Sequence, residues 1–254
     1  LSFAQWIERN KTKDVYLTQT SDRVVPLFHY SFITAPSSFI DKNRDKEFST
    51  LFKENMNCLV PLKEKQSHFN EENFYKIIKI IKYFEKNNVR VSRKFVLNEI
   101  VRSLKNKRML PAICFVLSRK LCYQYANEIS ETLFDYDSKA VSLVKNECLH
   151  ILRKLPNHDE YVHLPEFSQI IKLMEKGVAV HHSGVLPIFK EMIEIMFAKG
   201  FVKLLFATET FAVGVNMPTK TVIFTGFQKF SGSGFRTLHS HEYTQMAGRA
   251  GRRG

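Results

Sequence analysis

Short apolar runs bounded by turn residues alternate along this chain with longer segments of helical periodicity, and this alternation limits the possible folds more than any other feature. Short runs of this kind are typical of buried strands, and the segments between them predict crossover helices. The sequence therefore predicts an α/β fold with a mostly parallel sheet and helices on both faces. The predicted strands are residues 14–18, 112–117, 178–181, 202–208 and 221–225.

Helix start and stop signals support one strand–helix–strand unit in particular. Pro187 stands where a helix would begin, and Gly200 stands where it would end. Apolar side chains recur on one face of the segment between them. The unit belongs to a predicted layered domain, residues 111–254, whose further helices are expected at 119–134 and 166–176.

Residues 37–110 differ from the rest of the chain, because they are rich in Lys, Asn and Phe and have few strand signals. The whole chain has 38 Lys and Arg against 25 Asp and Glu, a net charge of +13, which favours nucleic acid before a membrane surface as partner. Residues 62–108 alone hold 13 of these basic residues and five acidic ones. We therefore expect 37–110 to be a basic, variable insertion that is partly helical.

Part of this insertion, residues 71–86, has the spacing of an amphipathic helix. Its basic face has two interpretations, a charged face kept for solubility or a contact with nucleic acid. The residues expected on its apolar face are Phe74, Ile77, Ile78, Ile81 and Phe84.

The four cysteines form no C-x-x-C pair, which fits reduced thiols in an intracellular protein. We expect the cytoplasm rather than the nucleus. No apolar run approaches the ~18 residues that cross a bilayer, so no membrane partner is expected. The chain opens with Leu1 rather than Met, from which we expect a piece of a longer protein.

Histidines raise two further questions. One cluster of Cys and His has a spacing that matches no common zinc finger, so no metal site is predicted. His181 and His182 are adjacent on a predicted strand, so one is expected to be buried and the other to face a loop. The residues of the cluster are Cys148, His150, His158 and His163.

Residues 245–254 carry the strongest chemical signal, the run QMAGRAGRRG, which follows a predicted helix start. Arg249 and Arg252 would lie one turn apart if that helix continued, and two forked cations suit phosphate oxygens. The alternative is a flexible Arg/Gly tail that binds RNA nonspecifically. Tyr243 and Met246 fit a helix packed on a core, which argues against such a tail.

A second signal is the run FATETFAVGVNMP at residues 206–218, which follows an apolar strand. In open α/β sheets ligands bind beyond the carboxyl ends of the strands, so Thr208, Glu209 and Thr210 come where a ligand would lie. Their hydroxyls and backbone amides suit phosphate oxygens. The residues alone equally allow an ordinary strand-to-helix connection in which Thr208 is the N-cap.

These two runs, together with GVAVHHSGVLPIFKE at 177–191 and the opening FAQWIERNK and VPLFHY, resemble the second RecA-like domain of superfamily 2 DExH-box helicases. The likeness is strongest to the superkiller-type, exosome-associated RNA helicases. It covers residues 2–30 and 111–254, whereas 37–110 matches poorly. Residues 1–36 are accordingly expected to be a lead-in into this domain.

The resemblance implies a role for each matching residue. Gln245, Arg249 and Arg252 would face ATP across a cleft, with the two arginines acting as fingers on the γ-phosphate. Gly214, Asn216 and Gly248 would contribute to nucleotide binding. The residues implied in gripping the nucleic-acid backbone are Thr208, Glu209, Ser118, Arg119, His182, Ser183 and Gly184.

The sequence contains no G-x-x-x-x-G-K-[ST] phosphate loop, so the resemblance implies that ATP and Mg²⁺ are bound mainly by a first RecA-like domain. Asp159 and Glu160 look only superficially like a DExH box and are interpreted as a loop. We expect the C-terminal half of the motor core of an ATP-dependent RNA helicase, inactive as this chain alone. The implied partners are single-stranded RNA, the first RecA-like domain and subunits of an exosome or superkiller-type complex.

Three alternatives stay open. The chain could belong to a nucleic-acid-binding or scaffold module that never turns over ATP, although the intact arginine pair argues against this. It could belong to a DNA helicase of the same superfamily, which the RRG ending disfavours. It could also act as a protein adaptor through its basic insertion.

Overall fold

The computed structural model describes residues 2–9, 16, 23, 25–42, 46–64, 68–135, 139–212, 217 and 219–251. The predicted strand 14–18 lies outside these ranges except for Tyr16. Three predicted site residues also lie outside them, namely Gly214, Asn216 and Arg252.

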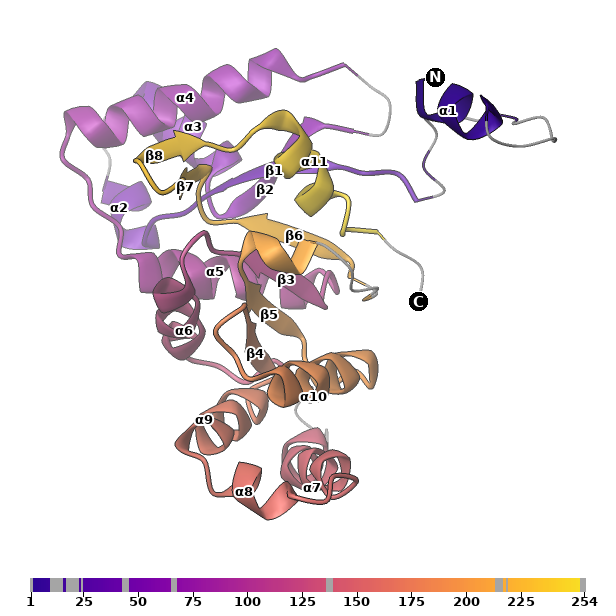
Figure 1. Cartoon of the computed structure of the whole chain (residues 1–254). Coiled ribbons are helices and arrows are strands. Elements are labelled where there is room, and N and C mark those ends of the chain that lie inside the picture. Colours follow the sequence, from indigo (N-terminus) through magenta and orange to yellow (C-terminus); the bar gives the residue numbers. More distant parts are fainter. Residues whose placement is uncertain are drawn as a thin grey trace.

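A four-stranded parallel sheet in the order β4-β5-β3-β6 forms the centre of the layered domain (Figure 1). In register, Ala112 lies opposite Leu204 on one side and Thr221 on the other. This confirms the predicted α/β class, and each strand falls within a predicted range. The strands are β3 (Ala112–Phe115), β4 (Val178–His181), β5 (Leu204–Ala207) and β6 (Thr221–Phe224).

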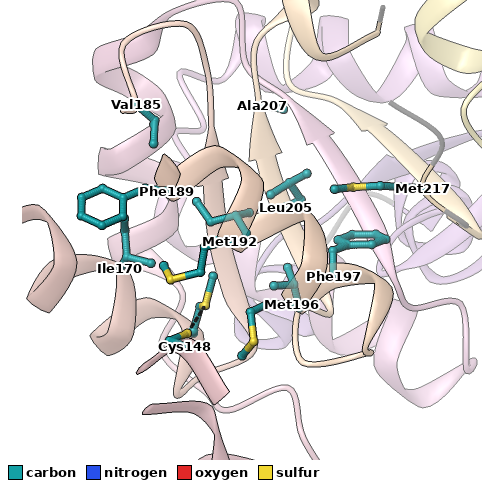
Figure 2. Close-up of a cluster of buried hydrophobic side chains, with 14 of the residues drawn as sticks. Cys148, Ile170, Val185, Phe189, Met192, Met196, Phe197, Leu205, Ala207 and Met217 are labelled. Carbon is teal, nitrogen blue, oxygen red and sulfur yellow. Dashed lines mark hydrogen bonds between the residues drawn. The ribbon is translucent and has the colours of Figure 1, made fainter. Parts of the chain in front are cut away.

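The sheet is covered on both faces, because consecutive strand residues point into two different hydrophobic clusters. In β5, Leu205 faces a cluster with α10, while Leu204 faces a second cluster with α5 and α6. Figure 2 shows the first cluster, in which Phe189, Met192 and Met196 of α10 pack beside the sheet. The helices are α5 (Arg93–Asn106), α6 (Arg119–Glu128), α7 (Ala140–Leu152), α8 (His158–Val162), α9 (Pro165–Met174) and α10 (Pro187–Ala198).

The predicted helix 119–134 is too long, because α6 ends at Glu128 and Ile129 is already extended. After Glu128 the backbone takes part in long-range hydrogen bonds instead of helical ones. Lys176 Nζ donates to the Ile129 carbonyl oxygen at 3.0 Å. The Leu133 amide donates to the Lys176 carbonyl oxygen at 2.8 Å. Tertiary contacts therefore override the helical pattern here.

The segment 37–110 contains a strand that its composition did not predict. β1 (His29–Ile33) and β2 (Cys58–Lys63) pair as a two-stranded antiparallel sheet. Pro61 lies within β2, and proline is tolerated there because each strand of a two-stranded sheet is an edge. A small separate core under this sheet is built by α2 (Ser37–Lys42), α3 (Lys46–Asn55) and α4 (Glu71–Lys86).

The helix predicted at 71–86 has those limits in α4, but its buried face is turned from the expected one. Ile77 and Ile80 are the buried residues, whereas Ile81 is 40% exposed and Phe74 is 38% exposed. Packing against α3 and β2 decides the orientation, which spacing alone left open.

The remaining elements precede or follow this framework. They are α1 (Ser2–Arg9), the 3-10 helix η1 (Glu209–Ala212), the hairpin β7 (Gln228–Phe230) and β8 (Phe235–Thr237), and α11 (Ser240–Ala247). None of the helices in the described ranges is both long and apolar enough to cross a bilayer.

Candidate functional site

Three loops meet at one edge of the central sheet. Because β4, β5 and β3 are neighbouring parallel strands, their carboxyl ends lie at the same edge. Ser118 follows β3, His182 follows β4 and Thr208 follows β5. The residues predicted to grip the nucleic-acid backbone thus come from one edge of the sheet.

The loops after β3 and β4 are close enough to act on one ligand. The Ser118 hydroxyl caps α6 by accepting from the Leu121 amide at 3.5 Å, and the next residue, Arg119, is exposed. A Cβ atom added at Gly184 would lie 3.8 Å from Cδ of Arg119. Arg119 is therefore brought beside Gly184 in an exposed position.

His181, the last residue of β4, and His182, which follows it, are both buried, so the expectation that only one of them is buried was wrong. His181 Nε2 lies 2.9 Å from Glu194 Oε1, and its ring packs on Phe211. His182 leaves the strand and folds back, where its Nδ1 accepts from the Gly184 amide at 3.0 Å. The loop residues that remain exposed are Ser183 and Gly184.

Burial lowers the pKa of both histidines, since it disfavours the charged imidazolium. For His181 the Glu194 carboxylate opposes this effect, and for His182 the Arg119 cation adds to it. A ring whose Nδ1 accepts an amide hydrogen is neutral with its proton on Nε2. His182 is thus suited to shape the loop rather than to transfer protons.

Thr208 is buried directly after β5. Its hydroxyl lies 3.0 Å from the Thr210 hydroxyl, and its carbonyl oxygen accepts from the Phe211 amide at 3.1 Å. The chain then forms the single turn η1. The two hydroxyls are therefore fixed to each other at the sheet edge.

An ion-pair network that sequence reasoning missed joins this edge to α11. Glu242 accepts from Lys229 at 2.9 Å, from Arg236 at 2.7 and 2.8 Å and from the His239 amide at 2.8 Å. Lys229 also approaches Glu209 at 3.5 Å. These donors hold the pKa of Glu242 well below its usual range, with Arg236 the largest cause. The sequence signal for it was a glutamate at the third helical position, as in a capping box.

The helix carrying Gln245 ends before Arg249, so the condition under which Arg249 and Arg252 would lie one turn apart is not met. α11 ends at Ala247, with Gly248 as its cap. The chain is then drawn toward β6, where Thr219 and Ala250 form a β-bridge. Gln245 is exposed, whereas Arg249 is buried.

Two glycines make this turn possible. A Cβ atom at Gly248 would lie 2.9 Å from the Thr244 carbonyl oxygen. Gly251 has φ +68° and its added Cβ would lie 2.9 Å from Val25 Cγ1, while its amide donates to the Thr219 carbonyl oxygen at 2.8 Å. Larger residues would shift the backbone on either side of Arg249.

A cavity of about 750 Å³ lies against the other side of α11. Among its lining residues are Arg23 and Lys63, and His29, whose Nδ1 is 2.7 Å from the Tyr243 hydroxyl. Burial lowers the pKa of His29, and Lys63 and Arg23 lower it further. The lead-in segment thus packs on the helix that precedes Arg249.

Of the Cys and His cluster, Cys148 and His150 lie in α7, and His158 begins α8. Cys148 is buried against Met174, with 3.7 Å between the sulfur atoms, and burial raises the pKa of its thiol to about 12. Asp159 and Glu160 lie in α8, so their interpretation as a loop was wrong. Within the described ranges no three His, Cys, Asp or Glu residues come together to hold a metal ion.

Comparison with known proteins matches residues 157–254 to the helicase conserved C-terminal domain. The chain is 36% identical over 99% of its length to DExH-box ATP-dependent RNA helicase DExH9 of Arabidopsis thaliana, covering 25% of that protein. It is 35% identical over 100% of its length to human superkiller complex protein 2, covering 20%. It is 34% identical over 99% of its length to the human exosome RNA helicase MTR4, covering 23%. The chain thus spans a quarter or less of these relatives.

Proposed function

We propose that this chain forms the C-terminal half of the motor core of an ATP-dependent RNA helicase. The premise is that it carries the helicase conserved C-terminal domain and resembles DExH-box RNA helicases of the superkiller and exosome type. In this proposal Arg249 and Arg252 reach the γ-phosphate of ATP held on a first RecA-like domain, with Gln245 beside them. The loops at the sheet edge grip single-stranded RNA.

One observation supports this division of labour best. The loops after three neighbouring strands end at one edge, and η1, which follows the middle strand, packs against α11. Phe211 of η1 and Met246 of α11 lie in the same hydrophobic cluster. If bound RNA displaced Thr208, the movement would therefore be transmitted to the turn that holds Arg249, because close-packed interiors transmit strain.

The contribution that this chain would make to ATP hydrolysis is electrostatic. A guanidinium directed at the γ-phosphate stabilises the charge of the transition state and is worth ~10³ to 10⁵ in rate in comparable phosphoryl transfers. Gly248 keeps the turn before Arg249 in place, since a Cβ atom there would meet the Thr244 carbonyl oxygen. Bound Mg²⁺ supplies charge neutralisation at the phosphates, and we propose that the first RecA-like domain holds it.

Turnover by the full-length protein tests the proposal. RNA-stimulated ATP hydrolysis is expected for the wild type, and the 254-residue chain alone should hydrolyse no ATP above background. RNA-stimulated turnover by the chain alone would overturn the two-half arrangement. Absence of turnover from the full-length protein would favour a binding or scaffold module instead.

Domain limits, partners and location form part of the same proposal. We propose a lead-in at 1–36, a basic insertion at 37–110 and the RecA-like domain at 111–254, with α5 of the insertion packed in the core of the sheet. The names of the relatives suggest subunits of a superkiller complex or an exosome as partners. An intracellular location is supported by four cysteines that are all free thiols.

A further inference from the structure

A groove with a volume of about 530 Å³ lies along α4, where this helix packs on α3. Three lysines and three aromatic rings are among its lining residues, and none of the lining residues is acidic. The lysines are Lys79, Lys82 and Lys86, and the rings are Phe48, Tyr75 and Tyr83.

The three lysines form one cationic row. They stand three and four positions apart on one helix, so they share a face and extend over about 10 Å of the helix axis. Lys79 is ion-paired with Glu47 and lies 5.3 Å from the centre of the Phe48 ring. Lys82 and Lys86 are exposed and form no ion pair with any described residue. Two of the three charges therefore face solvent.

Exposed rings continue the row toward the start of α4. Tyr75 is 65% exposed and Phe69 is 48% exposed, and the ring of Phe74 lies 6.0 Å from Tyr75 and 5.4 Å from Phe69. A face kept only for solubility gains nothing from such rings. Cations that follow a phosphate chain beside rings that stack on bases are the combination that binds single strands.

We propose that this groove binds single-stranded RNA, with Lys82 and Lys86 on phosphates and Tyr75 stacked on a base. The inference rests on the proposed function, because it takes RNA as the polyanion on which the protein acts. None of the lining residues of the groove comes from the loops after β3, β4 and β5, so the groove would add a second contact to the RNA strand. An acidic protein would use the lysines but has no need of Tyr75.

Salt dependence of RNA binding tests the lysines. Binding of a fluorescent oligouridylate to the full-length protein, without nucleotide, is measured over a series of salt concentrations for the wild type and for Lys82→Gln/Lys86→Gln. Each phosphate contact contributes about 0.7 to the log–log slope, so the slope should flatten by about 1.4. The matched control is Lys145→Gln/Lys154→Gln, which removes two exposed lysines at α7, at the opposite end of the molecule from α4 (Figure 1).

A second pair of variants tests the ring. Tyr75→Ala should weaken RNA binding about five-fold or more, and Tyr75→Phe, which keeps the ring, should bind like the wild type. Because Tyr75 is exposed, neither variant should change the melting temperature.

The outcomes separate this inference from the proposed function. An unchanged slope in the Lys82/Lys86 variant, or an equal change in the control, would overturn the groove while the wild type still binds RNA. Equal binding by Tyr75→Ala and Tyr75→Phe would remove the stacking role. Failure of the wild type to bind RNA at all would instead overturn the proposed function.

Discussion

The Arg23 guanidinium donates to the carbonyl oxygen of Ala250 at 2.9 Å, joining residues that are 227 positions apart. The same nitrogen lies 3.4 Å from the carbonyl oxygen of Gly248. Arg23 therefore spans the backbone on both sides of Arg249. It is placed to fix the proposed finger without touching a ligand itself.

Arg23→Ala is expected to lower kcat for ATP in the full-length protein by about 10-fold, because it removes the donor that positions the backbone on both sides of the proposed finger, and misplacement of a catalytic group costs rate. KM for ATP and the melting temperature should change little. Arg23→Lys should recover part of the rate, since it keeps one charged donor. A fall in stability that matches the fall in rate would mean that Arg23 is only structural.

Arg249→Ala should reduce ATP turnover of the full-length protein by at least ~10²-fold, a conservative value for an arginine finger. RNA affinity measured without nucleotide should barely move, because the sheet-edge loops are untouched. Steady-state kinetics and RNA titration check the two halves of this prediction. Loss of RNA binding in proportion to turnover would contradict the assigned role.

Thr208→Ala should act differently, because it removes one hydroxyl whose net hydrogen bond is worth ~1 kcal/mol. Basal hydrolysis should survive while its stimulation by RNA falls. Thr210→Ala deletes the partner hydroxyl 3.0 Å away and serves as the control. If both variants gave the same loss of hydrolysis and of thermal stability, the threonine pair would be structural.

Gly251→Ala should destabilise the protein more than Gly200→Ala. Both glycines have positive φ, +68° and +82°, so each alanine carries a backbone cost of ~1 to 2 kcal/mol. Only Gly251 would also bring a Cβ atom to 2.9 Å from Val25, whereas nothing lies within 4 Å at Gly200. Urea midpoints measure the difference, and equal midpoints would show that Val25 gives way freely.

Glu242 should make stability depend on acidity. Its pKa is lowered in the folded protein by Arg236, Lys229 and the His239 amide. The contribution of Glu242 to the free energy of unfolding is therefore present above the unfolded-state pKa, near 4.5, and is lost as the pH falls through the lowered folded-state pKa. Glu242→Gln should thus lower the melting temperature at neutral pH and matter less in acid. Glu160→Gln, an exposed glutamate in α8, is the control. A pH-independent difference would contradict the linkage.

The sequence allowed the central sheet to be predicted because three of its strands, β3, β4 and β5, are buried along their whole length and read as nearly continuous apolar runs. β2 was missed because Pro61 and half-buried neighbours break that pattern. The end of α11 was missed for a different reason. Its cause is a β-bridge between Thr219 and Ala250, and a long-range pairing leaves no local periodicity.

The candidate site likewise has parts that the sequence could predict and parts that it could not. Ser118 and Thr208 could be placed at the carboxyl edge of the sheet because each lies at the end of a predicted strand of a mostly parallel sheet. The burial of His182 could not, since it depends on an amide hydrogen bond from Gly184 after the strand has ended. The partners of Glu242 come from a hairpin whose approach to α11 has no sequence signature.

The contact between Arg23 and Ala250 has a consequence for the order of events during synthesis. A ribosome delivers Ala250 more than two hundred residues after Arg23, so Arg23 lacks this partner while the intervening chain is made. The bridge from Thr219 must wait for the same late segment. Contacts of such large sequence separation form slowly, so we expect this one to form late in folding. Nascent chains arrested before residue 250 should accordingly remain open to proteases at the lead-in.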